Sequence, residues 1–331
     1  MNKHIDSNDD SYLINNYIND TNINSYVFNK TLVLYTFHED SYNVRFFIKN
    51  GIFKSPYVDF ILICNNETLK IKCPDYVKYI NRPNTGYDFG GWSKGLLKND
   101  LYKNYYYFIF VNSSVIGPIT TKYYKNEWIN IYLDGLKDDV KLYGSMINIC
   151  GYMKECEPIA DSHVQSYAFC MNIDTLNLLI KKEIFSLTNL INKYEDVVIN
   201  KEIRMSREVL NNNGNIGCIF HHYNNIDFRD EKVYSNSIFK SNINTTKYYD
   251  ELIHPYELVF IKEKHISNKD WINKYTNYDD DDDEFNKSRK KNDTINKIIT
   301  INKTEDNNMF IYILIILIIC AVIFYIFKKY K

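Results

Sequence analysis

The chain has 331 residues, of which 45% are hydrophobic and 24% charged, enough for one large folded domain with appendages. Its formal net charge is −1, so no overall positive field attracts nucleic acid, which is not an expected partner. The seven cysteines form no CxxC pair and no Cys/His metal spacing, which excludes the common zinc motifs and favours a reduced compartment. A bridge between Cys150 and Cys156 is the alternative that the spacing leaves open.

Residues 1–29 are a polar, Asn-rich leader without the apolar stretch of a secretory signal. From residue 30 to residue 275, strand-like and helix-like segments alternate. We expect strands at 31–37, 57–64, 77–80, 105–111, 140–147, 168–171 and 216–220, and helices after Ser41, at 89–97, after a cap at Asp174, and at 194–210. This alternation predicts an α/β fold with a mostly parallel sheet covered by helices on both faces.

A charged stalk is expected at residues 276–308. It contains the acidic run 279–284 followed by basic residues, and adjacent like charges resist packing into a core. We interpret it as a disordered linker rather than a metal site, because no glycine turn shapes the acidic run.

Residues 309–327 are uncharged and apolar on every face, and 19 helical residues span roughly 28 Å, close to the thickness of a hydrocarbon core. We predict a single-pass transmembrane helix that acts as a C-terminal anchor, with a basic tip at 328–331; a buried C-terminal helix is the alternative. The lysines of the tip favour a cytosolic tip, whereas the absence of a secretory signal favours a cytosolic body. We expect the second arrangement.

The segment 82–92 lies between a predicted strand and a predicted helix. Arg82 is able to bind a phosphate or carboxylate, Asp88 can accept hydrogen bonds from ligand hydroxyls, and the amides at the following helix start would face an anion. Three glycines at 86, 90 and 91 permit tight turns or close approach to a ligand. The alternative is a Gly-rich turn closed by an Arg82–Asp88 ion pair.

The predicted strand 105–111 ends abruptly in Asn112-Ser113-Ser114. Open α/β sheets bind their ligands at such carboxyl ends of strands. Together with segment 82–92, this pattern predicts a site for a polar, phosphorylated ligand at the carboxyl edge of the sheet.

Several motifs in this order resemble the rhamnan-synthesis F type of glycosyltransferase. They are Arg82-x-Asn84-x-Gly86-x-Asp88-Phe89-Gly90-x-Trp92, Phe110-x-Asn112-x-Ser114-x-x-Gly117-Pro118, His163-x-Gln165-Ser166-Tyr167 and Glu202-x-x-x-Ser206 followed by Gly214. The segment His254-Pro255-Tyr256-Glu257-x-x-Phe260-Ile261-Lys262 is similar to a closing element of related sugar-transfer proteins.

The resemblance implies a GT-A/Rossmann-like fold that binds a nucleotide-sugar donor. It implies that Thr36, Phe37 and His38 lie near the nucleotide base. It assigns ribose and diphosphate to the loop residues Arg82, Asn84, Gly86 and Asp88, and it places Asn112 and Ser114 where many such enzymes carry an Asp-x-Asp metal motif.

Asn112-Ser113-Ser114 departs from that motif because it has no carboxylate, and neutral ligands bind Mg²⁺ or Mn²⁺ weakly. Either Asp88 supplies the metal ligand, or positive side chains and helix termini stabilise the leaving diphosphate, or catalysis is weakened. His221 or His222 alone is a further candidate for contact with a metal or the diphosphate.

Glu202 is the predicted catalytic base that accepts the proton of the acceptor hydroxyl, with Glu208 or Asp161 next in line. His163, Gln165 and Ser166 are predicted to contact the acceptor or the sugar. The alternatives are a surface Glu202 paired with Lys201 or Arg204, and a loop of polar groups that satisfy one another.

These observations predict a membrane-anchored glycosyltransferase that uses a nucleotide-sugar and a glycan or lipid-linked acceptor, with Mn²⁺ or Mg²⁺ as the candidate cofactor. The alternative function is a catalytically weakened or inactive protein of the same fold that binds glycans or nucleotide-sugars.

Overall fold

A computed structural model describes residues 30–121, 128–149, 162–230, 254–262 and 275–276, all within the unit Met1–Thr276. The predicted leader, the stalk beyond Thr276, the anchor and the tip lie outside the described residues, as do Cys150, Cys156 and Asp161. Within the described ranges, none of the helices has the length and apolar character needed to cross a membrane.

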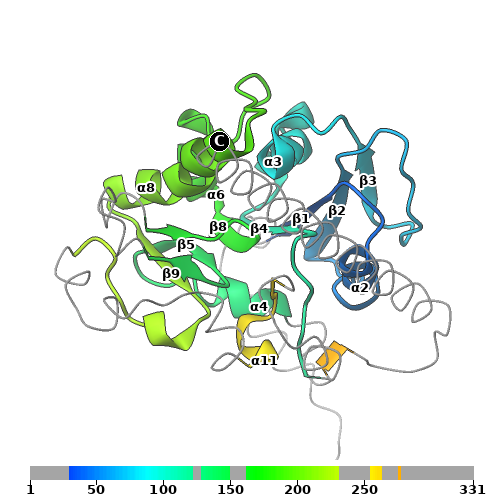
Figure 1. The fold of residues 1–331 in the computed structure, drawn as a ribbon. Coiled ribbons are helices and arrows are strands. Elements are labelled where there is room, and N and C mark those ends of the chain that lie inside the picture. Colours follow the sequence, from blue (N-terminus) through cyan, green and yellow to red (C-terminus); the bar gives the residue numbers. More distant parts are fainter. Residues whose placement is uncertain (1–29, 122–127, 150–161, 231–253, 263–274, 277–331) are drawn as a thin grey trace, which may run out of the picture. The chain divides into compact units, whose positions relative to one another are not determined.

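A seven-stranded sheet in the order β3-β2-β1-β4-β8-β5-β9 forms the centre of the fold (Figure 1). Strand β8 runs antiparallel to both β4 and β5, and the other neighbours pair in parallel. The fold is therefore α/β with a mostly parallel, mixed sheet, as the alternation of strands and helices predicts. The strands are β1 (Thr31–Phe37), β2 (Val58–Cys64), β3 (Lys78–Asn81), β4 (Tyr107–Asn112), β5 (Val140–Gly144), β8 (Ala168–Asn172) and β9 (Asn215–Cys218).

Strand β1 is buried along its whole length because helices cover both faces of the sheet. Tyr35 stacks on Phe47 of helix α2 (Tyr42–Asn50), with the ring centroids 4.0 Å apart. The neighbouring Leu34 points to the other face, where it packs against Gly95 of helix α3 (Tyr87–Leu97). A continuous apolar run in the sequence is what this two-sided burial requires.

The remaining helices extend the same two layers. Cys170 of β8 lies against the backbone of Tyr132 on one face, while Phe169 packs against Trp92 of α3 on the other. The helices are α4 (Trp128–Leu133), α6 (Ile173–Lys181), α7 (Tyr194–Val197), the π-helical turn η4 (Val198–Ile203), α8 (Arg204–Asn211) and α11 (Pro255–Leu258), with 3₁₀ turns η2 (Lys98–Asn104) and η5 (His221–Tyr223).

Three sequence expectations need correction. The strand predicted at 140–147 ends at Gly144, and β6 (Ile147–Asn148) pairs instead with β7 (His163–Val164) in a separate two-stranded sheet. Helix α6 is capped by Asn172, whose Oδ1 accepts the Thr175 amide at 3.0 Å, rather than by Asp174. The helical run predicted at 194–210 is present at 194–211, but its middle part, η4, is a π-helix rather than an α-helix.

Residues 254–262, here called the closing segment, return to the sheet from the C-terminal side. Ile261 and Ile116 exchange two backbone hydrogen bonds of 2.9 Å, and the Ile119 amide donates to Val259 O at 2.7 Å. Phe260 packs edge-on against Trp128 with 5.3 Å between ring centroids. The side chains from 258 to 261 are fully buried. This anchoring fixes the closing segment beside the chain that follows β4.

Candidate functional site

Asn112, the last residue of β4, connects three parts of the carboxyl edge. Its backbone amide donates to Tyr167 O at 3.0 Å, and its side-chain amide donates to Asp88 Oδ2 at 2.9 Å. Its Oδ1 accepts from both the amide and the hydroxyl of Ser114, at 3.0 and 2.6 Å. Every polar atom of the Asn112 side chain therefore has a partner within the protein.

Arg82 braces the loop that carries Asp88. The residue is buried, and its guanidinium donates to Asn65 Oδ1, to Thr85 O and, at 3.0 Å, to Thr85 Oγ1. A Cβ on Gly90 would lie 2.1 Å from Thr85 O, so only glycine allows the loop to close over the guanidinium. The structure has this arrangement instead of the alternative Arg82–Asp88 ion pair. Arg82 stabilises the loop through its hydrogen bonds to Thr85.

The start of helix α3 has an unusual backbone that orients Asp88. Gly86 has φ 72° and Tyr87 has φ 51°, and a non-glycine residue in this left-handed region is uncommon. Asn192 Oδ1 accepts from the Gly86 amide at 2.9 Å, and Tyr87 O accepts from Asn65 Nδ2 at 3.1 Å. These side-chain contacts hold the turn in place.

Asp88 titrates near neutrality. Burial is the largest cause that raises its pKa, and the negative charge of Glu202 raises it further, to a net value of about 7. The hydrogen bond from Asn112 and the positive charges of Lys262 and Arg82 lower the pKa and offset part of this effect. Asp88 and Glu202 are therefore close enough to interact, as two carboxylates of one site do.

Glu202 points into the same region. Ser166 donates from its amide to Glu202 Oε1 at 3.2 Å and from its hydroxyl to Oε2 at 2.9 Å, and His163 Nε2 lies 3.6 Å from Oε1. The alternative partners are engaged elsewhere: Lys201 donates to a backbone carbonyl, and Arg204 pairs with Glu208. Glu202 lies in the π-helical turn, a feature frequent at functional sites.

His163 and Gln165 support this arrangement from a buried position. Asn148 lies between them: its Nδ2 is 3.3 Å from His163 Nε2, and its Oδ1 accepts from Gln165 Nε2. Ser206 Oγ accepts from the Val164 amide at 3.0 Å, which connects the helix of Glu202 to strand β7. Glu202 and Ser206, which were expected on one helix face, both bind the segment 163–166. Glu202 accepts hydrogen bonds from Ser166, and Ser206 accepts one from Val164.

The remaining predicted donor residues differ in accessibility. Thr36 and Phe37 are buried at the end of β1, where Thr36 O accepts from the Ser113 amide at 3.0 Å. His38, Asn84 and Ser114 are exposed at the same edge. His38, Asn84 and Ser114 are therefore accessible to a ligand. Thr36 and Phe37 are buried and support the edge from inside the protein.

Two residues near the site were given no site role from the sequence, although Lys262 ends the closing motif named above. Tyr194 is 61% exposed, and its pKa is raised by partial burial and by the charges of Glu202 and Asp88. Lys262 ends the closing segment and acts electrostatically on Asp88. Because the chain has 30 tyrosines, the sequence does not mark Tyr194 as a site residue. The position of Lys262 depends on a long-range strand pairing that the local sequence does not predict.

The residues of this edge do not fit a Mg²⁺ or Mn²⁺ centre. Asp88 is the carboxylate next to Asn112, and Asn112 Oδ1 is already engaged by Ser114. His221, the other metal candidate, pairs through Nδ1 with Glu257, and its ring lies tilted against that of His222 with 4.0 Å between the centroids. Within the described ranges, no three His, Cys, Asp or Glu side chains are grouped so as to hold a metal ion.

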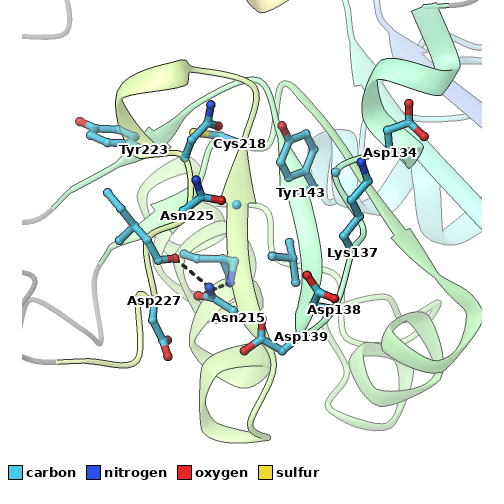
Figure 2. A pocket seen from close by; sticks show the side chains of 16 residues that line it. Asp134, Lys137, Asp138, Asp139, Tyr143, Asn215, Cys218, Tyr223, Asn225 and Asp227 are labelled. Atoms are coloured by element: carbon cyan, nitrogen blue, oxygen red, sulfur yellow. Dashed lines mark hydrogen bonds between the residues drawn. The ribbon is translucent and has the colours of Figure 1, made fainter.

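A pocket of about 370 Å³ lies elsewhere, beside strands β5 and β9 (Figure 2). Its lining includes Asp138, Asp139 and Asp227, but Arg229 pairs with both Asp139 and Asp227 and so neutralises much of this acidic character. None of the predicted site residues lines it. The pocket is therefore separate from the carboxyl-edge site.

No protein-family model matches the sequence, and no curated protein matches it. Among solved structures, the chain is similar to a glycosyltransferase involved in glycosylation of the major capsid of PBCV-1, with 13% identity and a TM-score of 0.27. The match covers 51% of this chain and 73% of that one. At this distance the likeness carries no weight for function, which we infer from the site residues themselves.

Proposed function

We propose that the protein is a glycosyltransferase that moves a sugar from a nucleotide-sugar donor to a hydroxyl of a glycan or glycolipid. The observation that carries the proposal is the convergence of two predicted groups of residues at one edge of the sheet. Asp88 and Asn112 are joined by a hydrogen bond, and Glu202 is held by Ser166 and influences Asp88 through its charge.

Each group suits one half of the reaction. The loop of Asp88 and the turn after Asn112 offer hydrogen-bonding groups to the donor. Glu202, fixed by two hydrogen bonds from Ser166, is in position to accept a proton from an acceptor hydroxyl. In the transfer, the acceptor oxygen bonds to the anomeric carbon, the bond from that carbon to the diphosphate breaks, and the acceptor proton passes to Glu202.

A non-catalytic protein that binds nucleotide-sugars or glycans on the same fold is the second candidate. The specific observation in its favour is that the segment Asn112-Ser113-Ser114 contains no carboxylate, and that the Asn112 side chain is fully engaged by Asp88 and Ser114.

Incubation of the full-length protein with a panel of nucleotide-sugars, with and without MnCl₂, separates the two candidates. We expect release of nucleoside diphosphate from at least one donor, and loss of that release in the E202Q variant. Donor binding without turnover would favour the second candidate, and an absence of both binding and turnover would reject the two together.

The predicted anchor at 309–327 adds a proposal that rests on sequence alone: the acceptor is membrane-proximal or lipid-linked, and the body is cytosolic. Fractionation of cells that express the full chain, or a chain ending at residue 308, tests it. Recovery of the full chain in the soluble fraction would contradict the tether and leave the transferase proposal standing.

A further inference from the structure

The closing segment brings a cation to the carboxyl edge. Lys262 follows Ile261, whose backbone is paired on both sides with Ile116, four residues after Asn112. The Lys262 ammonium lies 5.2 Å from the ring centroid of Tyr167, within the range of a cation–π contact. Tyr167 in turn accepts the Asn112 amide through its carbonyl and directly follows Ser166. Lys262 therefore lies beside Tyr167 at the edge where Asn112 ends β4, and its charge acts on Asp88.

The segment that carries Lys262 is rigidly held. Ser145 Oγ donates to Leu258 O at 3.0 Å, and Phe260 is buried against Trp128. Val259 has φ 64°, a rare conformation for a β-branched residue that persists only where surrounding contacts enforce it. Strain of this kind concentrates at functional sites, and here it lies three residues before Lys262.

A leaving diphosphate needs a positive group at this edge, and neither Arg82 nor a divalent metal is placed to supply it. Arg82 is committed to Asn65 and Thr85 beneath the loop, and the donor set around Asn112 does not fit a divalent metal. A diphosphate leaving group develops negative charge as its bond to the sugar breaks, and a preorganised positive group lowers the energy of that state. The charge of Lys262 already reaches the edge, because it acts on Asp88.

We propose that Lys262 supplies the positive charge that binds and neutralises the leaving diphosphate, in the place that a divalent metal takes in enzymes with an Asp-x-Asp motif. This inference rests on the proposed transferase function. The ammonium keeps its proton throughout: the electron pair of the broken bond goes to the diphosphate oxygen, and the acceptor proton goes to Glu202.

The test uses the full-length protein and its K262M, K262R and K30M variants. Lys30 pairs with Asp59 at the amino end of β1, so K30M removes a lysine at the opposite edge of the sheet. Binding of UDP, GDP, dTDP and CDP is measured by calorimetry in EDTA and again with MnCl₂, and thermal melts check the folding of each variant.

We expect wild type to bind at least one nucleoside diphosphate in EDTA. We expect K262M to weaken that affinity about tenfold or more, as for the loss of a charge-assisted hydrogen bond, while K262R and K30M stay within about threefold of wild type. If K262M melted early, retained binding in K262R together with a reduced salt dependence in K262M at low temperature would still support the role.

Wild-type binding that requires MnCl₂, or unchanged affinity of K262M in EDTA, would overturn the role of Lys262 and leave the transferase proposal intact. Failure of wild type to bind any of the four nucleotides, with or without metal, would overturn both.

Discussion

Ser166 donates two hydrogen bonds to Glu202, from its amide at 3.2 Å and from its hydroxyl at 2.9 Å, so one residue of the 163–166 strand end fixes both carboxylate oxygens. Only 18% of the Glu202 side chain is exposed, and its negative charge acts on Asp88. This arrangement gives the sharpest way to separate catalysis from donor binding.

Replacement of Glu202 by Gln is expected to lower turnover by about 10²- to 10⁴-fold, because the amide cannot take the acceptor proton. Gln has the size of Glu, and its one amide oxygen can still accept one of the two hydrogen bonds from Ser166, so donor affinity should stay within about threefold. Turnover is measured as release of nucleoside diphosphate, and affinity by calorimetry.

E208Q is the matched control for E202Q. Glu208 lies on the same helical run and pairs with Lys182 at 3.0 Å and Arg204 at 3.2 Å. Its loss should cost up to about 1 kcal/mol of stability and leave turnover unchanged. Equal loss of turnover in both variants would move the base away from Glu202.

Replacement of Asp88 by Ala should abolish detectable donor binding while the protein stays folded. The change removes the acceptor of the Asn112 amide hydrogen bond and leaves the Arg82 brace beneath the loop in place. Donor affinity from calorimetry, alongside a circular dichroism spectrum, checks the prediction. Unchanged affinity for every nucleotide-sugar in the panel would refute a donor role for Asp88.

The sequence predicted the parts of the fold that depend on local pattern. The apolar run of β1 and the Ser41 cap of α2 are confirmed, because burial on two faces and capping are readable in a few residues. The break after Gly144 and the antiparallel direction of β8 depend on which segments pair at long range, and local periodicity carries no such information.

The grouping of the candidate residues was predictable to a similar extent. Asp88, Asn112 and Glu202 were singled out because they stand at a strand end or in motifs, and the structure brings them close together. Asn65 was missed although it follows β2 in the same way that Asn112 ends β4, so the same rule could have found it. Lys262 is brought to the site by a pairing across 145 residues, between Ile116 and Ile261, which no local signal predicts.

The raised pKa of Asp88 makes stability depend on pH. Its pKa of about 7 in the folded protein lies above the ordinary aspartate value of 3.8, so the folded state holds this proton more tightly than the unfolded state. Unfolding free energy should therefore fall as pH rises from about 4 to 7 and level off above that. Four groups act on this carboxyl: Glu202, Asn112, Lys262 and Arg82. The D88N substitution removes the Asp88 carboxyl and leaves these four groups unchanged.

D88N is expected to be more stable than wild type at pH 8 by about 2 kcal/mol, roughly half of the full conversion of the shift because the side chain is partly exposed and screened. The difference should shrink toward pH 4. Urea titrations at pH 4.5, 6 and 8 measure it. D100N, which removes a surface carboxylate paired with Lys103, is the matched carboxylate-to-amide control. A stability difference independent of pH would contradict the assignment.

Gly90 tests whether the Arg82 brace holds the loop. A Cβ there would lie 2.1 Å from Thr85 O and 2.9 Å from the Arg82 guanidinium, and backbone cannot move aside cheaply. G90A should therefore lose about 2 kcal/mol or more of unfolding free energy and weaken donor binding at least tenfold. Urea unfolding and calorimetry with the donor measure the two effects.

G95A on the same helix is the control for G90A. Its Cβ would meet the ends of the Ile63 and Leu34 side chains at 2.8 and 2.9 Å, and such flexible groups can shift by a few tenths of an ångström. Alanine also favours a helix interior over glycine by up to about 1 kcal/mol, which offsets the crowding. G95A should stay within about 1 kcal/mol of wild type and keep its donor affinity. If both variants lost stability equally while donor binding survived, crowding within α3 would explain the result, and the loop beneath Asp88 would not depend on Arg82.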